Sequence, residues 1–94
     1  MEPIAVKVQI PDLLIHCTQG EKQVEVTGET VQGCLDQLLQ AWPLLKVHLF
    51  DEAGRLRPHV LIFYNEENTR WLQHLDIPVR AGDRITLLQS VSGG

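Results

Sequence analysis

A single amphipathic helix set among strand-like segments is the feature that most constrains the fold of this chain. Its apolar side chains recur at helical spacing and form one stripe: Val31, Cys34, Leu35, Leu38, Leu39 and Trp42. Thr30 precedes the stripe and is predicted to cap the helix, because its hydroxyl can accept a hydrogen bond from an N–H group of the first turn. Pro43 is predicted to end the helix, whose one apolar side has to be buried against another layer.

Strand-like segments lie on both sides of this helix. Residues 4–10 and 23–27 alternate apolar and polar side chains, which predicts two strands that pair antiparallel. Residues 13–17, between them, are apolar but irregular and are interpreted as a loop that plugs one end of the core. Residues 60–64 form a continuous run of strong β propensity. Residues 84–89 are predicted to form the last strand, parallel to the first.

Shorter segments complete the pattern. Residues 51–54 and 81–83 are predicted as turns, and residues 69–71 as a short edge strand. Residues 72–79 are interpreted as a loop with three side chains that pack inward: Leu75, Ile77 and Val79. The order ββαβ(β)β indicates an α+β fold, with a mixed sheet of four or five strands and one main helix on one face.

Composition limits the class of protein. Ninety-four residues make one domain, and the net charge of −4 argues against nucleic acid, whose partners carry basic patches. No segment approaches the roughly 18 apolar residues of a membrane span, and the first residues do not resemble a signal peptide. We therefore expect a cytoplasmic protein without a nucleic-acid or membrane partner, in which Cys17 and Cys34 stay reduced.

Neither a metal centre nor a catalytic set is predicted. The four histidines are dispersed along the chain: His16, His48, His59 and His74. Cys17 directly follows His16, but adjacent residues on a strand point to opposite faces, and no second ligand pair has zinc spacing. No nucleophile–base pair can be assembled either, so we expect no metal ligands, no catalytic residues and no enzymatic activity.

The sequence ends on four uncharged residues directly after the last predicted strand: Val91, Ser92, Gly93 and Gly94. Two glycines without Cβ atoms make a backbone thin enough to enter a narrow channel, and the tip offers only the α-carboxylate of Gly94. We therefore divide the chain into a folded domain over residues 1–88 and an extended tail over residues 89–94. Such a tail reaches roughly 20 Å at about 3.3–3.6 Å per residue.

The order of elements and the tail together resemble the ubiquitin-like β-grasp sulfur carriers, a family that includes the small subunit of molybdopterin synthase and the thiamin sulfur carrier. The resemblance extends over essentially the whole chain and is carried by these segments: 30–31, 42–43, 51–57, 60–67, 70, 81–85 and 91–94. Within this family the chain is most similar to carriers that serve cysteine or siderophore synthesis. It departs from the family at residues 89–90, where proline is frequent and this chain has Gln89 and Ser90.

The resemblance implies a function for Gly94. An adenylating enzyme of the ubiquitin-activating type uses ATP and Mg²⁺ to activate the Gly94 carboxylate, and sulfur converts it to a thiocarboxylate. A second partner, a biosynthetic enzyme, accepts the sulfur for cysteine, siderophore, thiamin or molybdopterin synthesis. The chain itself is expected to bind no cofactor. Two alternatives stay open: a ubiquitin-like modifier conjugated to lysines through Gly94, and a non-covalent β-grasp interaction module.

A docking surface is expected beside the tail. If alternate side chains of the strands at residues 60–64 and 84–89 face the helix, the remaining ones face away from it. Leu61, Phe63 and Leu88 would then form an apolar patch on the open face of the sheet. Exposed apolar patches mark interaction sites, so these three residues are the predicted partner-binding residues, with cover by a loop or a dimer partner as the alternative.

Overall fold

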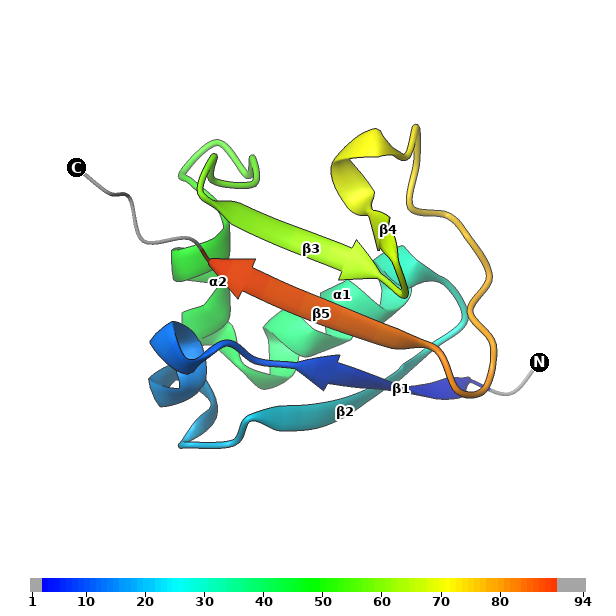
Figure 1. The fold of residues 1–94 in the computed structure, drawn as a ribbon, viewed down its shortest axis with the longest axis horizontal. Coiled ribbons are helices and arrows are strands. Elements are labelled where there is room, and N and C mark those ends of the chain that lie inside the picture. Colours follow the sequence, from blue (N-terminus) through cyan, green and yellow to red (C-terminus); the bar gives the residue numbers. More distant parts are fainter. Residues whose placement is uncertain (1–2, 90–94) are drawn as a thin grey trace.

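Five strands form one mixed sheet, in the order β2-β1-β5-β3-β4, and the helices α1 and α2 lie on one of its faces (Figure 1). The computed structural model describes residues 3–89. Its elements follow in chain order: β1 (Ile4–Gln9), the 3₁₀ helix η1 (Asp12–Thr18), β2 (Gln23–Gly28), α1 (Val31–Ala41), α2 (Pro43–Leu49), β3 (Val60–Tyr64), β4 (Glu67–Asn68), the 3₁₀ helix η2 (Thr69–Trp71) and β5 (Arg84–Gln89).

The pairing of the strands confirms the predicted topology. β1 pairs antiparallel with β2 along its whole length, and β5 pairs parallel with β1. β3 pairs antiparallel with β5 on its other side and with β4 at the edge. The sheet is therefore the mixed, five-stranded form of the predicted α+β fold, with β5 in its centre.

The core lies between the inner face of the sheet and the two helices. Alternate strand residues point into it, as the period of two predicts: Val6, Val8, Val24, Val26, Val60, Ile62, Ile85 and Leu87. The helices contribute the residues of their apolar sides: Val31, Cys34, Leu35 and Leu38 from α1, and Leu45 and Leu49 from α2. Leu14 of η1 is fully buried as well, and Val79 of the loop 72–79 packs inward as expected.

The predicted start of α1 is confirmed. The Thr30 hydroxyl accepts a hydrogen bond from the backbone N–H of Gly33 at 3.0 Å, which satisfies one of the free donors of the first turn. Gly28, the last residue of β2, comes two residues before this cap and lies very close to α1. A Cβ atom on Gly28 would lie 2.9 Å from both the backbone nitrogen and the Sγ of Cys34, so only glycine fits here without a shift.

Three local predictions need correction. Residues 13–17 are not an irregular loop but belong to η1, although they do close one end of the core. Pro43 does end α1, but it is also the first residue of α2. Proline is tolerated there because the backbone N–H that it lacks would have no hydrogen-bond partner in the first turn of a helix. Residues 69–71 form η2, and the short edge strand is Glu67–Asn68, two residues earlier.

No helix among residues 3–89 is both long and apolar enough to cross a bilayer. Cys17 and Cys34 are both buried free thiols.

The close approach at Gly28 predicts that Gly28→Ala lowers the free energy of unfolding by about 1–3 kcal/mol, because the new methyl group overpacks against the Cys34 backbone. Urea unfolding followed by circular dichroism measures the change. Gly33→Ala is the matched control: its Cβ would meet only the Thr30 hydroxyl, at 3.3 Å, and it should change stability by less than about 1 kcal/mol. Equal stability of Gly28→Ala and the wild type would contradict the close approach.

Candidate functional site

The candidate site lies at the end of β5, the strand that leads to the predicted tail (Figure 1). The parallel ladder with β1 stops at Thr86, whereas the antiparallel ladder with β3 continues to Gln89, which pairs with Val60. β5 thus extends past β1 but stays hydrogen-bonded to β3 up to its last residue. Gln89 is consequently held in a fixed position, while the predicted tail residues Val91, Ser92, Gly93 and Gly94 lie outside the described part of the chain.

A carboxylate fixes the beginning of β5. Asp83 follows the turn at Gly82, whose φ of +91° suits glycine, and its side chain accepts a hydrogen bond from the Arg80 N–H at 2.7 Å. It also accepts hydrogen bonds from the Tyr64 hydroxyl and from the Asn65 side-chain amide. These bonds tie the turn before β5 to the end of β3.

The electrostatics of this network follow from burial and hydrogen bonding. Burial tends to raise the pKa of Asp83, but hydrogen bonds from Tyr64, the Arg80 backbone and Asn65 outweigh it and hold the pKa below its usual value. Burial, together with the bond to Asp83, raises the pKa of Tyr64 to about 12. Both shifts favour the ionised carboxylate and the neutral phenol, the pair that holds the turn in place.

Two arginines fix the other end of the β3–β5 ladder. The Arg70 guanidinium donates hydrogen bonds to the carbonyl oxygens of Arg57 at 2.7 Å and Val60 at 3.1 Å. Arg57 in turn donates to the Val47 carbonyl of α2 through two nitrogens, at 3.0 and 3.2 Å. Because Val60 is the partner of Gln89, these bonds stabilise the sheet where β5 ends.

A shallow hollow of about 330 Å³ lies beside the last residue of β5. Five residues line it: Val47, His48, Arg57, His59 and Gln89. The side-chain oxygen of Gln89 is buried there and has no hydrogen-bond donor among residues 3–89. The surroundings of the last described residue therefore combine imidazole and guanidinium groups with the apolar side chain of Val47.

The three predicted partner-binding residues lie together on the open face of the sheet. Leu61 and Leu88 are directly opposite each other across β3 and β5. Phe63 lies two residues further along β3, on the same face, and is opposite Thr86. Leu88 is 41% exposed, and Leu61 and Phe63 are half-buried, whereas their neighbours Val60 and Ile62 point into the core. The predicted phase of β3 is thus correct; the role of this apolar patch in binding a partner stays a prediction.

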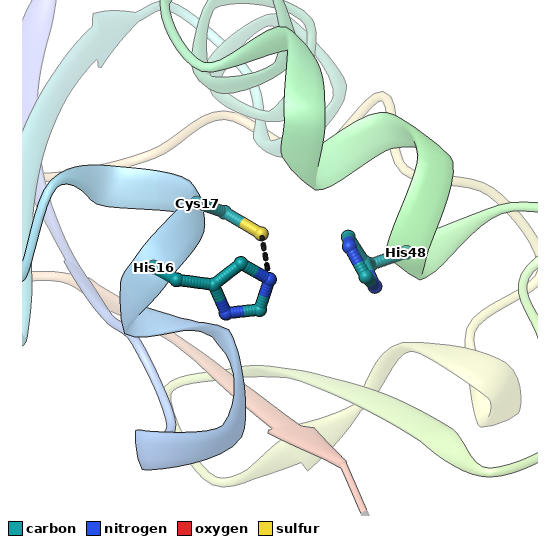
Figure 2. Close-up of side chains that lie close together, drawn as sticks. All are labelled: His16, Cys17 and His48. Atoms are coloured by element: carbon teal, nitrogen blue, oxygen red, sulfur yellow. Dashed lines mark hydrogen bonds between the residues drawn. The ribbon is translucent and has the colours of Figure 1, made fainter.

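A second group of side chains, which the sequence analysis set aside, also comes together. His16 and Cys17 belong to η1 and meet His48 of α2, with their candidate ligand atoms all within 4.8 Å of one another (Figure 2). The expectation that the first two diverge was wrong, because it assumed a strand where the chain forms a 3₁₀ helix. Burial raises the pKa of the Cys17 thiol.

Comparison with known proteins identifies the family. The ThiS family matches residues 8–94, nearly the whole chain and including the predicted tail. This chain belongs to the ThiS family. The sulfur carrier protein CysO of Mycobacterium tuberculosis is 32% identical to it over 91 residues, which span 95% of this chain and 98% of that protein.

Solved structures agree with this assignment. A chain of the Amycolatopsis orientalis BexX/CysO complex matches this ThiS-family chain with a TM-score of 0.79 and 35% identity, over 95% of this chain and 99% of that one. Small archaeal modifier protein 1 from Methanosarcina acetivorans matches with a TM-score of 0.80 and 28% identity over the full length of both. The predicted β-grasp fold and sulfur-carrier family are thereby confirmed. Proteins of this family are small sulfur carriers rather than enzymes, so the chain is not an enzyme.

The network around Asp83 predicts that Asp83→Ala lowers the free energy of unfolding by roughly 2 kcal/mol, because three hydrogen bonds to a charged acceptor are lost. Tyr64→Phe, which removes one of them, should cost about 1 kcal/mol. Denaturant unfolding of both variants at neutral pH measures these differences.

The pKa of Asp83 also sets a pH dependence. A carboxyl group with a lowered pKa in the folded state stabilises the protein above its ordinary pKa of 3.8, and this contribution is lost as the pH falls through the folded-state value. The stability difference between the wild type and Asp83→Ala should therefore shrink below that pH. A difference that stays constant from neutral to strongly acidic pH would contradict the lowered pKa.

Proposed function

We propose that this chain carries sulfur as a thiocarboxylate on Gly94 and donates it to a biosynthetic enzyme. The observation that carries the proposal is the family match, which extends through residue 94. It is supported by the similarity to a named sulfur carrier over nearly the full length of both proteins. The central position of β5 supports it as well, since a strand paired up to Gln89 provides a rigid base for the residues that follow.

The chemistry needs an activating partner, because a carboxylate is a poor acylating agent. The Gly94 carboxylate attacks the α-phosphorus of ATP on a ubiquitin-activating-type enzyme, pyrophosphate leaves, and an acyl-adenylate results. A sulfur nucleophile supplied by a partner then adds to the carbonyl carbon, and AMP leaves with the bond electrons. ATP and Mg²⁺ are bound by the partner enzyme, and this chain provides the acyl end group.

The apolar patch is the surface that we assign to docking. Leu61 and Phe63 lie on β3, and Leu88 lies on its neighbour β5, the strand that ends at Gln89, so a partner seated there is also close to Gln89. The solved complex that contains a chain similar to this one, named BexX/CysO, supports docking between such carriers and a second protein. Leu88 provides the most exposed apolar surface of the three residues.

The alternative function is protein modification. The similarity to small archaeal modifier protein 1 favours it, since an activated Gly94 could equally acylate a lysine amine. Intact-mass spectrometry of the chain isolated from cells distinguishes the two functions. Replacement of one oxygen by sulfur on the free chain indicates a carrier, whereas ladders of covalent adducts on other proteins indicate a modifier.

Removing Gly93 and Gly94, or adding one residue after Gly94, is expected to abolish sulfur loading, because the reacting carboxylate is then misplaced or absent. The folded domain should keep its melting transition, since residues 3–89 contain the core and the sheet. Mass spectrometry after incubation with the activating enzyme, ATP and a sulfur source measures loading, and calorimetry measures folding. Normal loading of the extended chain would contradict the proposed role of Gly94.

Leu88→Glu and Phe63→Glu are each expected to weaken binding to the activating enzyme by about tenfold or more, because a carboxylate replaces apolar contact area. Gln23→Glu is the matched control: it adds the same charge on the open face but on β2, at the far edge of the sheet. Titration calorimetry gives the three dissociation constants. Equal affinities of all three variants would remove the apolar patch as the docking surface.

A further inference from the structure

We propose that His16, Cys17 and His48 form a binding site for Zn²⁺, with one thiolate and two imidazole ligands and a fourth position open to water or another small ligand. The proposal rests on three candidate ligand atoms from two elements that gather within 4.8 Å, and on the distances between them (Figure 2). It is independent of the proposed sulfur transfer, which uses none of these side chains.

The distance between the first two ligands already fits tetrahedral zinc. The Cys17 Sγ lies 3.6 Å from the His16 Nε2. Zinc–sulfur and zinc–nitrogen bonds of about 2.3 and 2.05 Å at a tetrahedral angle place the two ligand atoms about 3.6 Å apart. A cation could therefore bind both atoms with little rearrangement of either side chain.

The two imidazole rings are also suitably placed. The ring centroids of His16 and His48 are 5.1 Å apart, and the ring planes are nearly perpendicular, at 88°. Two imidazoles bound to one tetrahedral zinc ion through nitrogens at about 2.05 Å have centroids roughly 5 Å apart. The ligand atoms lie within 4.8 Å of one another and then have to approach by at most about 1.5 Å, a change that would come from rotation of the side chains.

The backbone that carries these ligands is firmly held. In η1, the buried Thr18 hydroxyl lies 2.7 Å from the Glu21 carbonyl oxygen, and the Gly20 N–H donates to the Ile15 carbonyl at 2.8 Å. In α2, His48 lies next to Leu49, which is fully buried together with Leu45 one turn earlier. Both elements are thus anchored in the core, so the site needs only side-chain adjustment.

The ligand chemistry selects the class of metal. One thiolate and two imidazoles suit zinc, whereas Mg²⁺ and Ca²⁺ prefer oxygen ligands. Cys17 is buried, His48 is half-buried and His16 is exposed, so the cluster combines a protected sulfur with access from solvent. His48 also lines the hollow at the end of β5, which places the site beside Gln89. A bound ion would link η1 to α2 at this end of the sheet.

Cobalt provides the direct test, since Co²⁺ occupies tetrahedral zinc sites and reports its ligands by absorption. The full chain, without a polyhistidine tag and fully reduced, is titrated with Co²⁺ and then with Zn²⁺. We expect one ion per chain, a thiolate-to-cobalt charge-transfer band, the visible bands of tetrahedral cobalt, and displacement of cobalt by zinc. Zn²⁺ should also raise the melting temperature, because it binds the folded chain preferentially.

Variants locate the ligands. Cys17→Ser should abolish the charge-transfer band, and His48→Gln and His16→Gln should each weaken Co²⁺ binding by at least about tenfold. His74→Gln is the matched control, because His74 is exposed and outside the cluster, and it should bind as the wild type does. His16 is exposed as well, so its replacement tests the site without disturbing the core.

Two results would overturn the proposal. The first is the absence of a charge-transfer band in the folded wild type at any Co²⁺ concentration. The second is equal weakening, or no weakening, in His16→Gln and His74→Gln, which would show that the metal binds surface histidines without selection.

Discussion

The central position of β5 is the constraint on which the rest of this structure depends. One edge of β5 is paired with the first strand of the chain and the other with β3, so its backbone groups are hydrogen-bonded on both sides along the shared ladders. The connection from β2 to β3, which contains α1 and α2, therefore crosses one face of the sheet past β1 and β5 (Figure 1). It also makes the chain leave the domain from the interior of the sheet rather than from a frayed edge.

Both ends of β5 are held by polar groups that come from distant parts of the sequence. At its start, Asp83 joins the turn to Tyr64 and Asn65, and near its end, Arg70 holds the carbonyl of Val60. The domain is therefore stabilised where the chain enters and leaves this strand. Such a scaffold suits the proposed function, in which the folded part positions Gly94 and partner proteins supply the chemistry.

The region around the end of β5 has two chemically different surfaces. The apolar patch on the open face can exclude water from a protein interface, whereas the hollow at the end of the strand carries imidazole and guanidinium groups. The cluster of His16, Cys17 and His48 adjoins the second surface through His48. The apolar patch and the cluster share no residue, so the proposed docking and metal binding use different side chains.

Local patterns in the sequence determined β1, β2, β3, β5 and the start of α1, because these depend on the periodicity or β propensity of neighbouring residues or on one cap at Thr30. The place of β4 and the phase of the continuous apolar run in β3 were decided by packing in the sheet. The local patterns also carried the resemblance that the ThiS-family match confirms. Periodicity could not show that residues 13–17 form a 3₁₀ helix, whose apolar residues are too few to reveal a period. Only the tertiary structure decided that His48 faces His16 and Cys17, because packing of α2 against η1 brings together side chains that no sequence spacing relates.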